Sequence, residues 1–155
     1  MENEVWLFEC DVPGPPIGKG RPRGTTRGGY VKLYTPKKTA DWERSCAFVV
    51  RSQWNGAPLD GAVEIEFVAV FPRPKRLLRK KDPESRLLHT SKPDIDNIEK
   101  CLLDALVMAG VLRDDKGVCD VRKKKRYSSK VEGPSVYFRL RQLDEESTDE
   151  SRWFD

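Results

Sequence analysis

Histidine and cysteine, the residues that most often bind zinc in proteins, are scarce in this sequence. There is one histidine, His89, and there are four widely spaced cysteines, Cys10, Cys46, Cys101 and Cys119. A structural zinc site needs clustered ligands such as a CxxC pair, and a disulfide framework is typical of small secreted domains. The sequence therefore favours neither a zinc site nor a disulfide framework. We expect the cysteines to be small buried residues in a reducing compartment, and His89 to be a surface residue or a phosphate contact.

Long apolar runs are also absent. No stretch approaches the roughly 18 residues that a membrane span requires. The chain opens on a strand-like run at residues 5–8 and has no basic leader before it. We therefore expect a cytoplasmic protein without a membrane partner. Its 155 residues are enough for one domain with a hydrophobic core.

The net charge of +4 is unevenly distributed along the chain. Residues 144–155 contain six acids and one arginine, a net charge of −5, so residues 1–143 carry +9. A basic domain is suited to binding phosphates, although a solvated surface explains the charge equally well. We expect residues 1–143 to form the folded domain and residues 144–155, which lack a periodic pattern, to be a disordered acidic tail.

Apolar patterns predict an α+β domain with the element order β(β)αβαββ, in which both helices cover one face of a mixed sheet. The Gly- and Pro-rich segment 13–24 is expected to be a basic loop, and Thr35 to cap a helix that begins at Pro36. A second irregular segment covers residues 72–93. The predicted strands cover residues 5–12, 30–34, 62–71, 118–127 and 135–143, the last two as a closing pair, and the predicted helices cover residues 36–54 and 94–109.

Two aspartates, Asp94 and Asp96, begin the second predicted helix. Helix capping and the helix dipole explain one acid at this place better than two acids followed, one turn later, by Lys100. Two carboxylates beside a third acid from a loop would form an all-oxygen pocket that suits Mg²⁺ or Mn²⁺. Spacing alone leaves both interpretations open. Lys100 by itself is explained by an ordinary ion pair with an acid four residues away.

Six short sequence motifs contain these acids or lie before or after them in the chain. They are Pro93-Asp94-Ile95-Asp96-Asn97-Ile98-Glu99-Lys100, Leu103-Asp104-Ala105-Leu106, Gly110-Val111-Leu112-Arg113-Asp114-Asp115, Gly18-Lys19-Gly20-Arg21-Pro22-Arg23, Tyr34-Thr35-Pro36 and Trp42-Glu43. Together they resemble the RusA family of Holliday-junction resolvases, especially its phage and prophage members, over residues 5–142. One departure is Lys116-Gly117, where the family pattern has a longer polar side chain such as Gln.

The resemblance implies a homodimeric, Mg²⁺-dependent, structure-selective endodeoxyribonuclease. Such an enzyme resolves Holliday junctions by paired symmetric nicks in DNA recombination and repair. Carried over position by position, the metal-binding catalytic acids are Asp94, Asp96 and Asp115, and the essential lysine is Lys100. The implied partner is four-way branched DNA, and no small-molecule cofactor is expected. Two other functions fit the same residues: a non-catalytic branched-DNA-binding recombination accessory protein, and a general flap or fork nuclease.

Basic side chains beyond the acids are expected to form the DNA surface. Arginine can hold a phosphate with two hydrogen bonds, and glycine lets the backbone approach closely. Because alternate residues of a strand share a face, only one set of the cations at positions 122–126 can face DNA. The candidate DNA-binding residues are Lys19, Arg21, Arg23, Arg27, Lys92, Arg122, Lys124 and Arg126.

The distance between the acids leaves the subunit arrangement open. From Asp96 to Ala109 a helix advances about 20 Å, and the five residues from Gly110 back to Asp115 span at most about 17 Å. A site within one chain therefore requires this segment to double back along the helix. Alternatively, an antiparallel dimer with Leu103 and Val107 in its contact would bring Asp115 to the acids of a second subunit.

Overall fold

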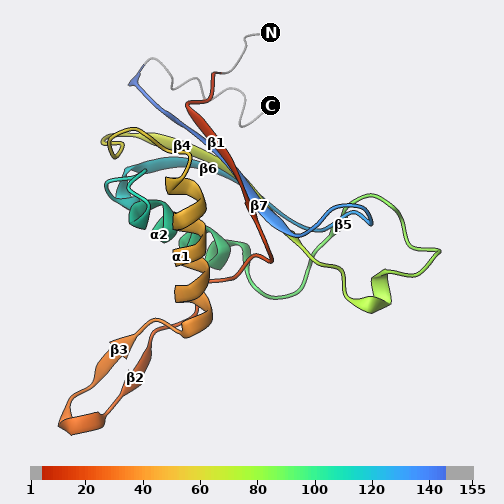
Figure 1. Ribbon diagram of the computed structural model, residues 1–155, viewed down its shortest axis with the longest axis horizontal. Coiled ribbons are helices and arrows are strands. Elements are labelled where there is room, and N and C mark those ends of the chain that lie inside the picture. Colours follow the sequence, from red (N-terminus) through yellow and green to blue (C-terminus); the bar gives the residue numbers. More distant parts are fainter. Residues whose placement is uncertain (1–4, 146–155) are drawn as a thin grey trace.

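The computed structural model describes residues 5–145, with Arg27 described by its backbone alone, and its five-stranded sheet carries two helices on one face (Figure 1). The strand order is β1-β7-β4-β6-β5; β4 and β6 run parallel, and the other neighbours run antiparallel. The predicted α+β class with a mixed sheet is confirmed. The elements of this layer pair are β1 (Phe8–Pro13), α1 (Lys37–Arg51), β4 (Val63–Phe71), β5 (Leu87–Leu88), α2 (Ile95–Met108), β6 (Val118–Tyr127) and β7 (Ser135–Gln142).

The hydrophobic core lies between the sheet and the helices. β4 is the central strand and is buried along almost its whole length, while β7 alternates buried with half-buried residues. From α2, the side chains of Ile98, Leu102 and Leu106 are fully buried in this core. Their spacing of three and four residues fixes which side of α2 faces inward. The opposite side, which carries Asp96, Lys100 and Asp104, is therefore presented outward.

The two C-terminal strands do not form the closing pair that the sequence predicts. β6 and β7 each pair with β4, which lies between them. The alternating patterns identified each strand correctly, but they do not specify which edge a strand joins. β4 and β6 can be parallel because the connection between them, which contains α2, is long enough to cross over.

The helix boundaries differ from the prediction only at α1. Pro36 occupies the N-cap position without a side-chain hydrogen bond, so the expected Thr35 cap is wrong, and α1 ends at Arg51 instead of Trp54. The α2 boundaries agree with the sequence, because Ala109 is the C-cap and Gly110 follows with φ +77°. That backbone conformation favours glycine.

The basic loop predicted at residues 13–24 runs into a separate hairpin. β2 (Arg23–Thr25) and β3 (Lys32–Tyr34) pair antiparallel around the short 3₁₀ turn η1 (Arg27–Gly29). The hairpin does not join the main sheet and projects beyond the N-terminal end of α1 (Figure 1). The strand predicted at residues 30–34 is therefore present as β3, but it pairs with the nearby β2 and not with the main sheet.

The irregular segment after β4 is organised by one buried arginine. Arg73 donates hydrogen bonds to the carbonyl oxygens of Ser128, Leu77, Pro83 and Ser85 at 2.8, 2.9, 2.7 and 2.6 Å. These bonds tie the end of the sheet to the 3₁₀ turn η2 (Lys75–Leu77) and the residues beyond it. A segment without helical or strand periodicity is thereby held in one conformation.

The expectations for His89 and Cys119 are also wrong. His89 is buried, with its ring centroid 4.2 Å from that of Tyr127 and 4.5 Å from that of Phe71. Cys119 is exposed, whereas Cys10, Cys46 and Cys101 are buried as expected.

The predicted acidic tail, residues 144–155, lies mostly outside the described residues. Residues 144 and 145 are exposed, and the expectation of a disordered tail at positions 146–155 lies outside the described residues. Within residues 5–145, no helix is long and apolar enough to cross a membrane.

Candidate functional site

The two aspartates at the start of α2 are not used as helix caps. Asp94 occupies the N-cap position, yet its side chain makes no capping hydrogen bond. Asp96 lies in the first helical turn and accepts a bond of 3.1 Å only from the adjacent Asn97 N–H. Both side chains are exposed. Capping alone therefore does not explain Asp94, and both carboxylates are accessible to a ligand.

Lys100 lies one turn after Asp96 and bridges two acids. Its Nζ donates to Asp115 Oδ2 at 2.7 Å and to Asp104 Oδ1 at 2.9 Å. These hydrogen bonds, that to Asp115 first, raise the pKa of Lys100 well above its usual range. Lys100 is therefore held as an ammonium at neutral pH, in a fixed position beside Asp115.

Asp115 reaches Lys100 because the chain doubles back after α2. The N–H groups of Val111 and Leu112 both donate to the carbonyl of Leu106, at 3.0 and 3.3 Å. Leu112 then forms a parallel bridge with Leu59, and both Val111 and Leu112 are buried. The reversal places Asp115 beside Lys100 of its own chain. This contact joins Asp115 to Lys100 and not to Asp94 or Asp96, so a site within one subunit and a site shared by two subunits both stay predictions.

Leu103, which the sequence offered as a dimer contact, is buried in the intrachain core. Val107 also packs against that core. The two residues are therefore engaged within the chain that carries them.

The adjacent acids Asp114 and Asp115 have different surroundings. Asp114 caps the 3₁₀ turn η3 (Asp115–Gly117), where its Oδ1 accepts from the Lys116 N–H at 3.0 Å. That hydrogen bond is the main cause that lowers the pKa of Asp114. Asp115 instead points its Oδ2 at Lys100. Asp114 thus shapes the turn from which Asp115 extends.

A chain of alternating charges continues from Lys100 into the interior. Asp104 bridges Lys100 and Lys19, whose Nζ lies 3.0 Å from Asp104 Oδ2 and 2.7 Å from Oε1 of the buried Glu43. Burial opposes the charge on Lys19, but its hydrogen bonds to Glu43 and Asp104 outweigh that effect and raise its pKa. Lys19 was expected to contact DNA. Its ammonium is instead engaged by two carboxylates and is only 21% exposed.

Glu43 and Asp104 were not assigned to the site from sequence. A signal for Glu43 exists, because it lies on the buried side of α1 with Thr39, Cys46 and Val50. A carboxylate in such a stripe needs a buried partner, since unpaired charges are rarely buried. The sequence does not reveal that this partner is Lys19, 24 residues earlier.

The structure does not gather the three predicted metal ligands into one group. Among the described residues, no cluster of three or more His, Cys, Asp or Glu side chains could hold a metal ion. Asp115 is brought to Lys100, while Asp94 and Asp96 are at the exposed start of the same helix. The donor set nevertheless fits a hard divalent cation chemically, because it consists of carboxylate oxygens only.

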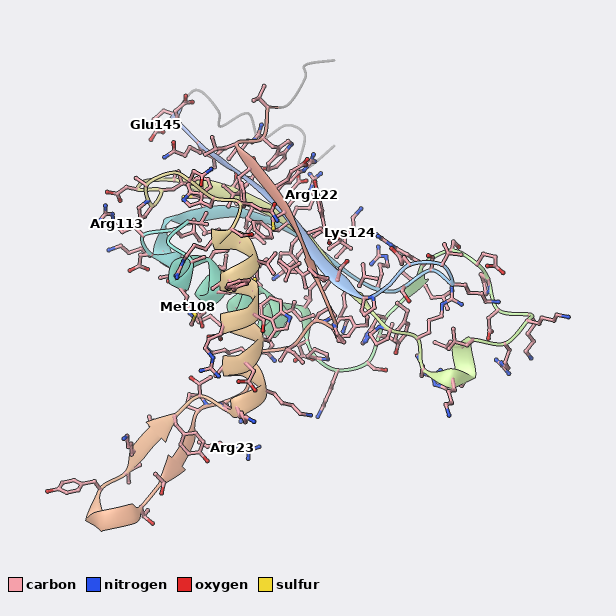
Figure 2. All side chains as sticks on the ribbon, in the orientation of Figure 1. Arg23, Met108, Arg113, Arg122, Lys124 and Glu145 are labelled. Carbon is pink, nitrogen blue, oxygen red and sulfur yellow. The ribbon has the colours of Figure 1, made fainter. Side chains whose placement is uncertain are left out.

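The cations of β6 divide between the two faces of the sheet. Lys123 pairs with Glu99 of α2 at 3.4 Å, and Lys125 donates to the carbonyls of Ser91 and Pro93 at 2.6 and 2.9 Å. By strand alternation, Arg122 and Lys124 are on the face away from the helices (Figure 2). The helix-side cations thus brace the start of α2.

The other candidate DNA contacts are scattered. Arg122 and Lys124 are exposed on the outer face, and Arg126 on that face donates to the Lys125 carbonyl at 2.9 Å. Lys92, just before α2, is exposed, as are Arg21 and Arg23 at the base of the hairpin. Arg27 is in the turn at the hairpin tip.

Comparison with known proteins gives consistent matches over the region that contains the site. Residues 13–137 match the family model described as endodeoxyribonuclease RusA. The chain is 33% identical over 137 residues to an uncharacterized protein, YqaN, of Bacillus subtilis (strain 168), covering 85% of this chain and 94% of that protein. It is 24% identical over 139 residues to the crossover junction endodeoxyribonuclease RusA of Aquifex aeolicus (strain VF5), covering 90% and 96%.

Proposed function

Because this chain belongs to the RusA family of endodeoxyribonucleases, we propose that it resolves Holliday junctions by paired symmetric nicks in DNA recombination and repair. The observation that carries the proposal is the contact of 2.7 Å between Lys100 and Asp115, formed beside the acid-bearing start of α2. It joins a cation to a carboxylate at an exposed place that a DNA backbone can reach. We further propose a cytoplasmic enzyme.

Asp94, Asp96 and Asp115 are proposed to hold Mg²⁺, for which Mn²⁺ could substitute. All three side chains offer carboxylate oxygens, the donor type that Mg²⁺ prefers. Asp94 and Asp96 are also exposed and form no ion pair among the described residues. When bound, the ion would supply a polarised phosphoryl oxygen and an activated water. The chain would contribute three negative charges that offset the charge of the cation.

Lys100 is proposed to stabilise negative charge on the phosphate during cleavage. Asp104 and Asp115 fix its ammonium from two sides, so little reorganisation is needed when charge develops. Because lysine is protonated at neutral pH, Lys100 acts as a cation.

A homodimer is proposed because two symmetric nicks require two sites. The proposed DNA contacts are Arg21, Arg23, Arg27 and Lys92 on the side of the hairpin and the α2 start, and Arg122, Lys124 and Arg126 on the outer sheet face. A four-way junction presents several duplex arms, so contacts on separate faces are compatible with one substrate. Lys19 is not among the proposed contacts, because it pairs with the buried Glu43 and with Asp104 and is only 21% exposed, whereas Lys100 is 51% exposed.

The test is a substrate panel for the purified full-length protein. Four-way junction, flap, fork and linear duplex of matched length would be incubated with Mg²⁺ or with EDTA, and the cut positions mapped on each strand. The proposal predicts cleavage of the junction at symmetric positions, in Mg²⁺ only. Preferred cleavage of flaps or forks would instead indicate a general structure-selective nuclease. Tight junction binding without cleavage in Mg²⁺ or Mn²⁺ would indicate an accessory protein.

A further inference from the structure

The hairpin that projects beside α1 belongs to a strongly basic part of the chain. Between Asp11 and Asp41 there are seven lysines and arginines and no acid. We call residues 21–34 the basic arm. It extends away from the sheet and helices, with Arg23 near its base (Figures 1 and 2). A projecting element with charge of one sign is suited to an anionic partner and disfavours contact with a second copy of itself.

The basic arm also exposes apolar side chains that the core does not use. Tyr30, Val31 and Leu33 are 80%, 73% and 67% exposed, and Tyr34 is 48% exposed. A two-stranded hairpin is only marginally stable by itself in water. Apolar residues gathered on such an element indicate a surface that is covered by a partner.

Strand pairing separates the arm into two faces. Arg23 lies opposite Tyr34, and Thr25 lies opposite Lys32. Residues directly opposite in an antiparallel pair share a face, so one side of the arm combines two cations with an aromatic ring. Leu33 lies opposite Gly24 on the other side. Cations beside exposed aromatic rings are the combination that binds unpaired nucleotides, through phosphate contacts and base stacking.

The base of the arm is fixed to the candidate site. Lys19 N–H donates to the Asn97 carbonyl of α2 at 2.9 Å, and Gly20 N–H donates to Thr39 Oγ1 of α1 at 3.1 Å. The packing is close, because a Cβ on Gly18 would lie 2.6 Å from Pro93 Cβ. With the Lys19 ammonium also bound to Glu43 and Asp104, the arm begins at a defined place beside the first turn of α2.

From this placement we propose that the basic arm binds unstacked nucleotides at the branch point of junction DNA. Arg21, Arg23 and Lys32 contact the phosphates, and Tyr30 and Tyr34 stack on the bases. The arm thereby selects branched over linear DNA. This inference rests on the proposed function for its substrate, but it assigns the selection to a surface separate from the cleavage residues.

The test measures binding in EDTA, where cleavage is not needed. The full-length protein would be titrated against a four-way junction with 2-aminopurine at the branch, a duplex with the same label, and a single-stranded oligonucleotide. Tyr30→Ala and Tyr34→Ala are each expected to weaken junction binding by about tenfold to a hundredfold, the range for one lost base-stacking contact. The 2-aminopurine signal of the junction should also change less than with the wild type, and duplex binding should change by less than about twofold.

The control is Phe48→Ala, which removes a 78% exposed aromatic ring from α1, outside the arm. It should leave junction affinity unchanged. Equal losses on junction and duplex would overturn the proposal in favour of non-selective phosphate binding. Unchanged binding with a loss of the dimer, measured by light scattering, would identify the arm as a subunit contact instead. If the wild type does not cleave junctions in Mg²⁺, the proposed function fails, while retained tyrosine-dependent binding of the single strand would still support the arm as a nucleotide-binding surface.

Discussion

At the scale of single residues, His89 shows how packing decides chemistry that sequence leaves open. A histidine in an irregular basic segment is expected to be a surface residue or a phosphate contact, and His89 is instead buried. Here the ends of β4 and β6 place Phe71 and Tyr127 against the imidazole. Burial, with the Lys125 ammonium nearby, lowers the pKa of His89.

The lowered pKa predicts that acidification destabilises the protein. Below the unfolded-state pKa of about 6.5, the unfolded chain binds a proton at His89 more readily than the native protein. Stability is therefore full above this pH and falls as the pH decreases through the window below it. Urea unfolding should give a lower free energy of unfolding at about pH 5.5 than at about pH 7.5. The difference should be smaller in His89→Phe than in the wild type. Glu132, whose pKa Arg86 lowers to about 2, titrates well below this window. Equal losses in both proteins would contradict the assignment to His89.

Asp104 contacts both lysines of the charge chain, so it is predicted to be a positioning residue. Asp104→Asn removes the charge that holds Lys19 and Lys100 together. We expect kcat for junction cleavage to fall by about tenfold or more while KM changes little, as for supporting residues of metal sites. Asp104→Glu should recover part of the rate.

The matched control for this prediction is Asp60→Asn, which removes an exposed acid paired with Arg113 at 3.5 Å. Its kcat should equal that of the wild type. A rise in KM with unchanged kcat in Asp104→Asn would show that Asp104 acts in binding instead.

At the scale of elements, the sequence predicts the helices and strands that are specified by the spacing of nearby residues. β4, α2 and the glycine that ends α2 follow from apolar spacing and backbone conformation. The positions of β6 and β7 on either side of β4 do not follow from such local patterns, because strand pairing depends on segments that are distant in sequence. Asp94 and Asp96 can be singled out from the sequence because they are close together in it. The contacts Lys19–Glu43 and Lys100–Asp115 depend on the folded chain.

The segment after β4 is predicted to depend on Arg73 for its order. Arg73→Met keeps the apolar stem but removes the donors to four carbonyl groups. Leaving such groups unpaired should lower the free energy of unfolding by about 2–4 kcal/mol. Arg73→Lys should not restore it, because an ammonium cannot reproduce the planar geometry of guanidinium.

Urea unfolding would measure the loss of stability, and hydrogen exchange should show faster exchange at residues 75–88. Arg76→Met is the control, because Arg76 is exposed in the same segment. Equal stability of Arg73→Met and Arg76→Met would refute the role of Arg73.

At the scale of the whole molecule, the proposed DNA contacts are divided between the side of the arm and the α2 start and the outer sheet face. A surface that binds phosphates releases counterions, so junction affinity should fall steeply with salt. Replacing Arg21 and Arg23 by Gln should reduce the slope of log K against log salt by about 0.9 for each lost phosphate contact. The comparison is Lys80→Gln with Lys81→Gln, two exposed cations beyond η2. A slope that is the same in both double variants would contradict a DNA role for the arm.

The central claim is that Asp115 and Lys100 act with Asp94 and Asp96 in one metal-dependent nuclease site. The most direct measurement is the rate of Mg²⁺-dependent junction cleavage by Asp115→Asn beside its neighbour control, Asp114→Asn. Asparagine can still cap η3 in place of Asp114, so that variant should cleave like the wild type. Asp115→Asn should bind the junction and fail to cut it. Cleavage at the wild-type rate by Asp115→Asn would contradict the account.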